Sequence, residues 1–201
     1  MLTTTLRRIR EHSPCRGGWT NLTRELGGLR KYGLDTELAI ERIVETNGVQ
    51  DAIWCLRATV QDSGPFCTEL ACRFAEAVLG YFESEFPDDD RPRKAIEAAR
   101  SGDAEAARRA ALAALRSARL ASAAAEDAAR RDASSAAAAL AARAAASALA
   151  AGAAASALAA HADARAALGA RYYEAKIEAR QRMIFTKLLG EQKTADGELD
   201  V

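Results

Sequence analysis

Residues 65–82, PFCTELACRFAEAVLGYF, decide the fold class. Large apolar side chains recur at every fourth position of this stretch, as Phe66, Leu70, Phe74 and Val78, and Tyr81 and Phe82 continue the same face. Charged side chains occupy the other side, as Glu69, Arg73, Glu76 and Glu83. This period is that of an amphipathic α-helix. We therefore expect a core helix that Ser63 caps, with Pro65 in its first turn, and that ends at Phe86–Pro87.

Similar patterns predict helices on both sides of this core helix. Asp35 is a candidate N-cap, Asn47–Gly48 is typical of a helix stop, and Gly102 is a second stop. Alternating apolar segments, which indicate strands, are almost absent. The fold class that follows is all-α. The expected helices are Leu2–His12, Thr20–Lys31, Asp35–Thr46, Val49–Ala58, Arg91–Arg100 and Tyr172–Leu189.

The second half of the chain has a different composition. Residues 103–170 are more than half alanine, the residue with the highest helix propensity. A single rod and a folded-back pair of helices both fit this composition, and we expect folding back near Asp132–Ser135, which offers an N-cap. The predicted architecture is a helical bundle in which residues 1–100 form an N-terminal compact helical domain. Residues 101–190 form long Ala-rich antiparallel helices packed on it, and residues 191–201 form a flexible tail.

Composition excludes several classes of protein. The chain has 28 Lys and Arg against 28 Asp and Glu, so its formal net charge is zero, and a general nucleic-acid binder needs a basic excess. Residues 1–10 lack the apolar run of a secretory signal. The charge-free window between Arg143 and Asp163 holds mainly alanine, which is nearly neutral in membrane insertion. We expect a cytoplasmic protein with no membrane partner and no direct contact with nucleic acid.

The reactive residue types are few and scattered. We expect the four cysteines, Cys15, Cys55, Cys67 and Cys72, to be reduced and mostly structural. The one local pairing that resembles a nucleophile with its base is Cys15 with His12. His161 is the second histidine, and it stands far from the first. Trp19 and Trp54 are expected to be core anchors, with partial exposure as the alternative for Trp19, which follows Gly17–Gly18. No catalytic, cofactor-binding or metal-binding motif is recognisable, so we expect no catalytic, cofactor or metal site.

The densest charge cluster is Asp88-Asp89-Asp90-Arg91. An acid before Arg91-Pro92 is well placed to cap the following helix and to meet the positive end of its dipole. A divalent-cation site and a contact patch for a protein partner are the alternatives. These four residues, Asp88, Asp89, Asp90 and Arg91, are therefore the candidate partner-binding residues.

Several stretches together resemble a family of immunity proteins with an Imm-5-like domain. They are HSPCRGGW at residues 12–19, ETNGVQDAIWCLRA at 45–58, the helix around Ala71-Cys72-Arg73, and FPDDDRPRKAIEAAR at 86–100, followed by the Ala/Arg-rich segment. The resemblance implies an all-helical, cytoplasmic, non-enzymatic protein of bacteria or their phages. Proteins of that family neutralise a toxin by binding it.

The function that we expect is stoichiometric inhibition of a bacterial toxin by protein–protein binding, without enzymatic activity. A phage-encoded inhibitor of a host defence system, of the anti-CRISPR type, would use the same physics on another target. A self-associating structural protein, and with it a homo-oligomer, is a further alternative, because small alanine side chains let helices approach closely.

Overall fold

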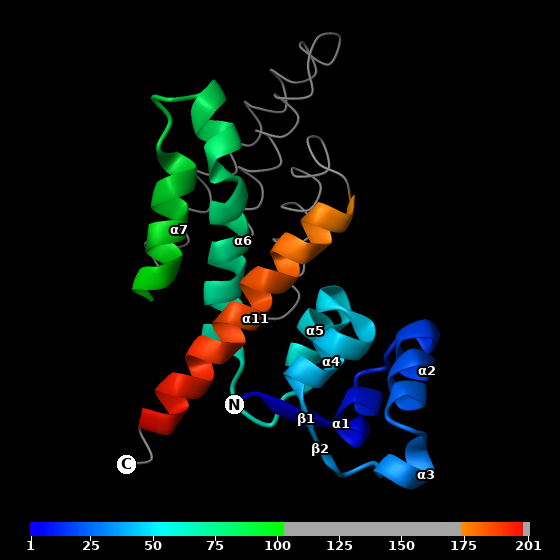
Figure 1. Cartoon of the computed structure of the whole chain (residues 1–201). Helices are drawn as coiled ribbons and strands as arrows, with labels where there is room; N and C mark the ends of the chain where they lie inside the picture. Colours follow the sequence, from blue (N-terminus) through cyan, green and yellow to red (C-terminus); the bar gives the residue numbers. More distant parts are fainter. Residues whose placement is uncertain (103–173, 199–201) are drawn as a thin grey trace. The chain divides into compact units, whose positions relative to one another are not determined.

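The structure is a computed structural model that describes residues 1–102 and 174–198 (Figure 1). These residues are mainly helical, which confirms the all-α fold class. The chain divides into two compact units, one made of Met1–Ser63 with Arg182–Val201 and the other of Gly64–Gln181. The predicted turn near Asp132–Ser135, the window between Arg143 and Asp163, and His161 lie outside the described residues.

The first unit contains a small sheet that the sequence analysis did not anticipate. Strands β1 (Thr3–Thr5) and β2 (Glu37–Ala39) pair antiparallel, with Thr4 opposite Leu38. The predicted helix Leu2–His12 was wrong at its start, because its first residues form β1 and helix α1 covers only Leu6–Glu11. Three β-branched threonines favour an extended backbone, but three residues are too few to show an alternating pattern.

Two further helix boundaries differ from the prediction. The predicted helix Thr20–Lys31 is divided into α2 (Arg16–Glu25) and α3 (Leu29–Tyr32), because Gly27 and Gly28 adopt positive φ values of 84° and 92°. Asp35 is not an N-cap. Its carboxylate instead accepts two hydrogen bonds from Arg7, at 2.5 and 2.7 Å, and helix α4 begins after β2.

The Asn47–Gly48 stop is confirmed. Helix α4 (Ile40–Asn47) ends there and α5 (Val49–Cys55) starts immediately afterwards, followed by the short 3₁₀ helix η1 (Leu56–Ala58). Gly48 has φ 87° and ψ 176°, a conformation that is essentially restricted to glycine. Its N–H donates to the carbonyl of Val44, and its own carbonyl accepts from Ala52. One residue therefore ends one helix and starts the next in a new direction.

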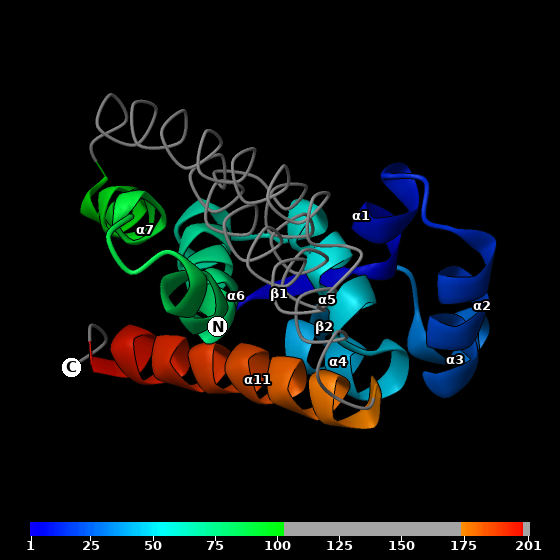
Figure 2. The ribbon, with the colours of Figure 1, turned by 90° about the horizontal axis from the view of Figure 1, so that it is seen from above.

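Buried apolar side chains from Leu2, from β2 and from most helices of the first unit form its core. Helices α4 and α5 are in direct contact and lie side by side in Figure 2. The core is composed of Leu2, Leu6, Ile9, Leu22, Leu38, Ile40, Ile43, Val44, Val49, Ala52, Ile53, Cys55, Leu56, Ala58, Phe185, Leu188 and Leu189.

The second unit contains the core helix that residues 65–82 predict. Helix α6 (Gly64–Glu85) runs beside α7 (Arg91–Ser101), and the same pair is adjacent in Figures 1 and 2. The predicted stripe is confirmed, since Phe66, Leu70, Phe74, Val78 and Phe82 are at most 5% exposed. Helix α7 ends at Gly102, which has φ 72°. The Ser63 hydroxyl, just before α6, donates to the carbonyl of Leu56 at 2.8 Å.

Arginine–carboxylate pairs join α6 to α7. Arg100 donates to Glu69 at 2.8 Å and to both carboxylate oxygens of Glu76, while Arg73 donates to Glu69 at 2.8 Å. Burial alone would raise the pKa of Glu69, but the hydrogen bonds from Arg100 and Arg73 outweigh it and lower the pKa below the ordinary value. Arg93 donates to Glu83 at 2.5 Å further along the pair.

Helix α11 (Glu174–Glu198) belongs to both units, since the division between them falls after Gln181. The sequence placed its end at Leu189 and a flexible tail after it, whereas the helix continues to Glu198. Within the first unit, Lys193 Nζ lies 2.6 Å from Glu41 Oε1 on α4. This ion pair and the buried Phe185 attach the C-terminal part of α11 to the first unit.

A pair of glycine substitutions tests the break between α4 and α5. Gly48→Ala should lower the free energy of unfolding by about 1–3 kcal/mol, because alanine is strained at this φ and ψ. Gly80→Ala is the matched control. Gly80 lies inside α6 and a Cβ there would meet no atom within 4 Å, so we expect a gain of about 0.5–1 kcal/mol. Urea unfolding of both variants measures the two changes, and a neutral Gly48→Ala would contradict the assignment.

The Glu69–Arg100 pair predicts a specific loss of stability in acid. A carboxylate whose pKa is lower in the folded state stabilises the fold above its unfolded pKa, and this contribution disappears as the pH falls through the folded pKa. Arg100→Gln should therefore lower the melting temperature at pH 7 and flatten its decline below about pH 4.5. Arg24→Gln removes a more exposed pair with Glu25 and serves as the control. Equal slopes in wild type and Arg100→Gln would disprove the assignment.

Candidate protein-binding surface

The acidic cluster Asp88–Arg91 is largely occupied by its own neighbours. Asp89 accepts two hydrogen bonds from the Arg91 guanidinium, at 2.7 and 2.6 Å, and a third from the Arg91 N–H at 3.2 Å. The hydrogen bond from Arg91 to Asp89 raises the pKa of that guanidinium. Asp90 occupies the N-cap position of α7 but pairs with Lys94 at 2.8 Å instead of capping with its side chain.

Asp88 is the exception in this cluster. It is exposed, and within the part of the chain that the structure describes it forms no hydrogen bond or ion pair. The arrangement agrees with a helix start that is built from Asp89 and Asp90. Of the four candidate partner-binding residues, Asp88 alone has its charged group entirely available.

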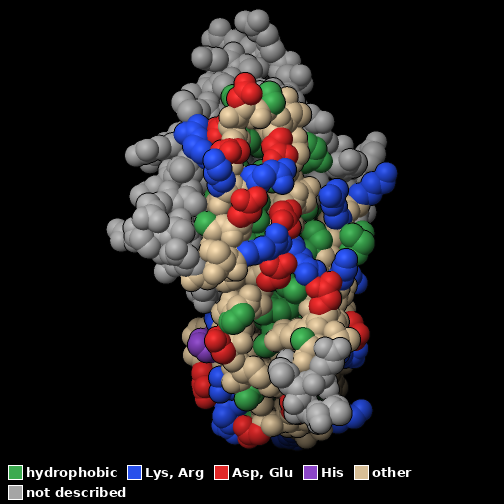
Figure 3. All heavy atoms as spheres, turned by 90° about the vertical axis from the view of Figure 1, so that its left-hand side faces the viewer, with side chains coloured by type: hydrophobic (Ala, Val, Ile, Leu, Met, Phe, Trp, Pro, Cys, Tyr) green, Lys and Arg blue, Asp and Glu red, His purple; other side chains and the backbone are tan. Residues whose placement is uncertain are grey.

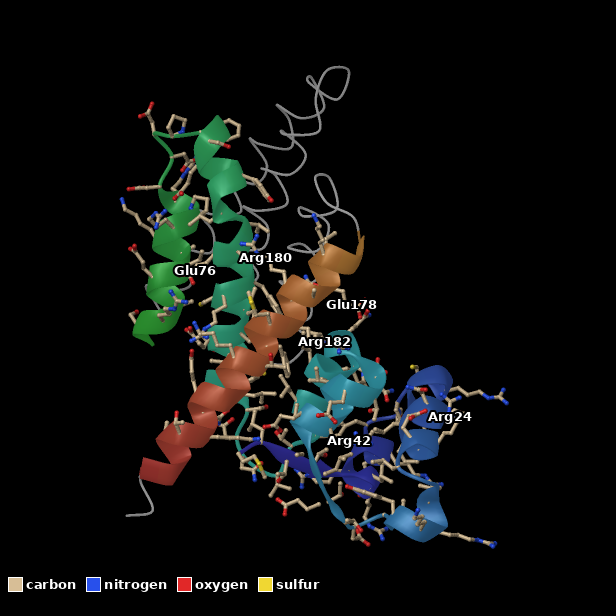
Figure 4. The ribbon with its side chains drawn as sticks, in the orientation of Figure 1. Arg24, Arg42, Glu76, Glu178, Arg180 and Arg182 are labelled. Carbon is tan, nitrogen blue, oxygen red and sulfur yellow. The ribbon has the colours of Figure 1, made fainter. Side chains whose placement is uncertain are left out.

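Opposite charges are intermingled on the face that carries α7. Figure 3 views the molecule from that side and shows Asp and Glu side chains interspersed with Lys and Arg over the area of α6 and α7. Arg93–Glu83 and Arg100–Glu76 belong to this set, and Glu76 is labelled in Figure 4. Because these charges are paired within the second unit, the face carries no strong field of one sign.

The structure brings together two of the stretches quoted above, HSPCRGGW and ETNGVQDAIWCLRA. Asn47 Nδ2 donates to the carbonyl of Gly18 at 2.9 Å and to Asp51 Oδ2 at 2.8 Å. Asn21 adds a hydrogen bond to the Thr46 carbonyl at 2.8 Å. A Cβ on Gly18 would lie 2.7 Å from Asp51 Oδ2, so a larger residue where α2 approaches α5 would require the Asp51 carboxylate to shift. These polar residues thus join α2 to α4 and α5.

Three of the four cysteines are buried and one is exposed. Cys55, Cys67 and Cys72 are buried, and burial raises the pKa of Cys55 and of Cys72 to about 12, which keeps both thiols protonated. Cys15 is exposed, and its Sγ accepts a hydrogen bond from the Gly18 N–H at 3.3 Å, so it caps α2. His12 is exposed at the end of α1, and no hydrogen bond joins these two described side chains.

The two tryptophans, expected as core anchors, lie at the edge of the core. Both Trp19 and Trp54 are only partly buried. The Arg57 guanidinium lies over the Trp54 ring, 4.7 Å from its centroid, and its Nε donates to the Trp54 carbonyl at 3.0 Å. The pair occupies the surface where α5 passes into η1.

Sequence reasoning missed Arg57 as a functional candidate. The available signal is the spacing Trp-x-x-Arg within a predicted helix, because residues three apart lie on the same helical face. Arg57 follows buried Leu56 and precedes buried Ala58, so the local backbone is fixed on both sides.

Residues 1–102 and 174–198 contain no group of three or more His, Cys, Asp or Glu side chains arranged to hold a metal ion. Their helices include none long and apolar enough to cross a membrane.

The chain was compared with protein families, curated proteins and solved structures. No protein-family model, no curated protein and no solved structure matches the chain. The resemblance to Imm-5-like immunity proteins is consequently neither supported nor contradicted by these comparisons.

Substitutions at adjacent aspartates separate a structural role from a contact role. Asp89→Asn should destabilise the fold by about 1 kcal/mol, because it weakens a charge-assisted bidentate pair and the acceptor for the Arg91 N–H. Asp88→Asn should leave the melting temperature unchanged, since that carboxylate is exposed. Thermal unfolding followed by circular dichroism measures both. Equal effects of the two changes would contradict the helix-start assignment.

Proposed function

We propose that this chain is a non-enzymatic inhibitor that binds a protein partner in a stoichiometric complex, as an immunity protein neutralises a toxin. One structural observation carries the proposal. A partly exposed tryptophan with an arginine stacked on its ring lies at the surface of the first unit, where α5 passes into η1. Tryptophan and arginine are enriched among the residues that contribute most to protein–protein binding.

The rigidity of the surroundings supports this interpretation. The stretch ETNGVQDAIWCLRA buries Ala52, Ile53, Cys55, Leu56 and Ala58 in the core of the first unit, so α5 is anchored along its length. A surface that is already ordered loses less conformational entropy on binding than a mobile one. Trp54 and Arg57 are consequently presented in a fixed geometry, which favours recognition of one particular partner.

The resemblance to immunity proteins suggests the biological class of the partner. Under this proposal the partner is a bacterial toxin, and a host defence protein is the alternative target if the gene is of phage origin. Asp88 is a second, separate candidate contact, because its carboxylate is exposed and unpaired.

The function predicts a defined complex. The full-length chain, tagged and incubated with bacterial lysate, should retain one protein in a stoichiometric amount, identified by mass spectrometry. Titrating that purified protein should then abolish its toxic activity at one molar equivalent, because a binding inhibitor acts by occupying its target. Failure to retain any stoichiometric partner under several conditions would count against the proposal.

Self-association is the competing outcome in the same samples. Light scattering of the purified chain should give a molar mass that does not change with concentration. A mass that rises with concentration, together with the absence of a captured partner, would replace the inhibitor with a self-associating structural protein.

A further inference from the structure

Arginines of the first unit differ in the kind of partner that their guanidiniums have. Arg7, Arg24 and Arg42 each lie within ion-pair distance of a carboxylate, and the last two are labelled in Figure 4. Arg8 and Arg57 instead donate to main-chain carbonyls. Within the described residues, neither of their guanidiniums has a carboxylate partner. Their positive charges are therefore held in place without being neutralised.

Both guanidiniums are fixed at the same segment of chain. Arg8 Nε donates to the Ala58 carbonyl at 2.9 Å and its Nη2 to the Thr59 carbonyl at 2.6 Å. Ala58 directly follows Arg57, whose guanidinium folds back over Trp54. Arg57 uses only Nε for its hydrogen bond, so both of its terminal nitrogens remain donors, and Arg8 keeps Nη1.

An exposed apolar residue lies on the same segment. The side chain of Val60 is accessible, with 57% of the residue exposed, while its N–H donates to the Thr3 carbonyl at 2.8 Å and fixes the backbone on β1. Trp54 contributes the part of its ring that is not buried. We call Arg8, Trp54, Arg57 and Val60 the Trp54–Val60 surface. It combines two fixed cationic groups with two apolar ones.

We propose that the Trp54–Val60 surface binds an acidic segment of a protein partner. This inference rests on the proposed function and names the chemistry of the partner. Carboxylates of the segment would accept hydrogen bonds from the free donors of Arg8 and Arg57, and an apolar side chain between them would cover Val60 and the Trp54 ring. Charge-assisted bonds between guanidinium and carboxylate are the strong members of their class.

The composition of the surface favours a protein over a nucleic acid. Affinity for nucleic acid grows with the number of phosphates that a protein neutralises, and this surface offers two cations. Covering Val60 and Trp54 removes apolar area from water, which a segment with an apolar side chain can do. The acidic residues nearest to these four along the chain are Asp62, Glu11 and Asp51, and the Asp51 carboxylate accepts a hydrogen bond from Asn47.

Opposite charges introduced at Val60 test the sign of the partner. Short fluorescent peptides that combine Asp and Glu with Leu and Phe are titrated against the full-length chain by fluorescence polarisation. Val60→Glu should weaken binding by about tenfold or more, whereas Val60→Lys should keep or strengthen it. The side chain is exposed, so unchanged melting temperatures confirm that both variants fold. Equal affinities of the two variants would overturn the proposal.

Arginine variants and control probes complete the experiment. Arg57→Met should also lower the affinity for the acidic peptide by about tenfold. Arg24→Met, which removes an arginine that pairs with Glu25, should leave that affinity unchanged. The same peptides with Asn and Gln in place of Asp and Glu should bind at least about tenfold more weakly. Equal binding of acidic and neutral peptides, or Arg57-dependent binding of a short DNA duplex in their place, would overturn the proposal.

The outcomes distinguish this inference from the proposed function. If Val60→Glu and Arg57→Met still capture the stoichiometric partner as wild type does, the inhibitor function stands and the Trp54–Val60 surface is wrong. If wild type captures no partner, the inhibitor function fails, and the peptide titrations still decide whether the surface selects acidic segments.

Discussion

The break between α4 and α5 at Asn47–Gly48 is the constraint on which the first unit depends. Gly48 adopts a backbone conformation that other residues reach only with strain, and this allows α5 to start without an intervening loop. Asn47, at the same point, donates to Gly18 and Asp51 and so joins three helices. The direction of α5 fixes η1, and with it the place of Trp54 and Arg57. A surface feature thus follows from the geometry of one glycine.

The two units satisfy their charges in different ways. In the second unit, arginines of α7 pair with carboxylates of α6, which holds the helices together and leaves a face without strong charge of either sign. In the first unit, Arg8 and Arg57 are held by carbonyl groups, which orient a guanidinium without cancelling its charge. A fixed, uncompensated charge beside partly exposed tryptophan is suited to recognition, whereas an internal ion pair is suited to stability.

The sequence predicted the parts of the fold that rest on periodicity and on glycine. The stripe from Phe66 to Val78 is long enough for a helical period to be unambiguous, and Gly48 and Gly102 end helices where their neighbours indicated. The strand Thr3–Thr5 could not be predicted, because its partner Glu37–Ala39 is distant in the chain and neither strand shows alternation. Local patterns do not contain such long-range pairing.

The candidate surface was harder to predict than the fold. Asp88–Arg91 stands out as a charge cluster, yet only three-dimensional contacts show that Asp89 and Asp90 pair with Arg91 and Lys94. Trp54 looked like a core residue because tryptophan is usually well buried, and its partial exposure depends on the packing of α5.

The most direct test of the account is hydrogen–deuterium exchange of the full chain, free and in its stoichiometric complex. If the inhibitor binds through the Trp54–Val60 surface, amide hydrogens of residues 54–61 should exchange more slowly in the complex, while those of α7 remain unchanged. Slower exchange that is confined to the start of α7, with residues 54–61 unaffected, would contradict the account.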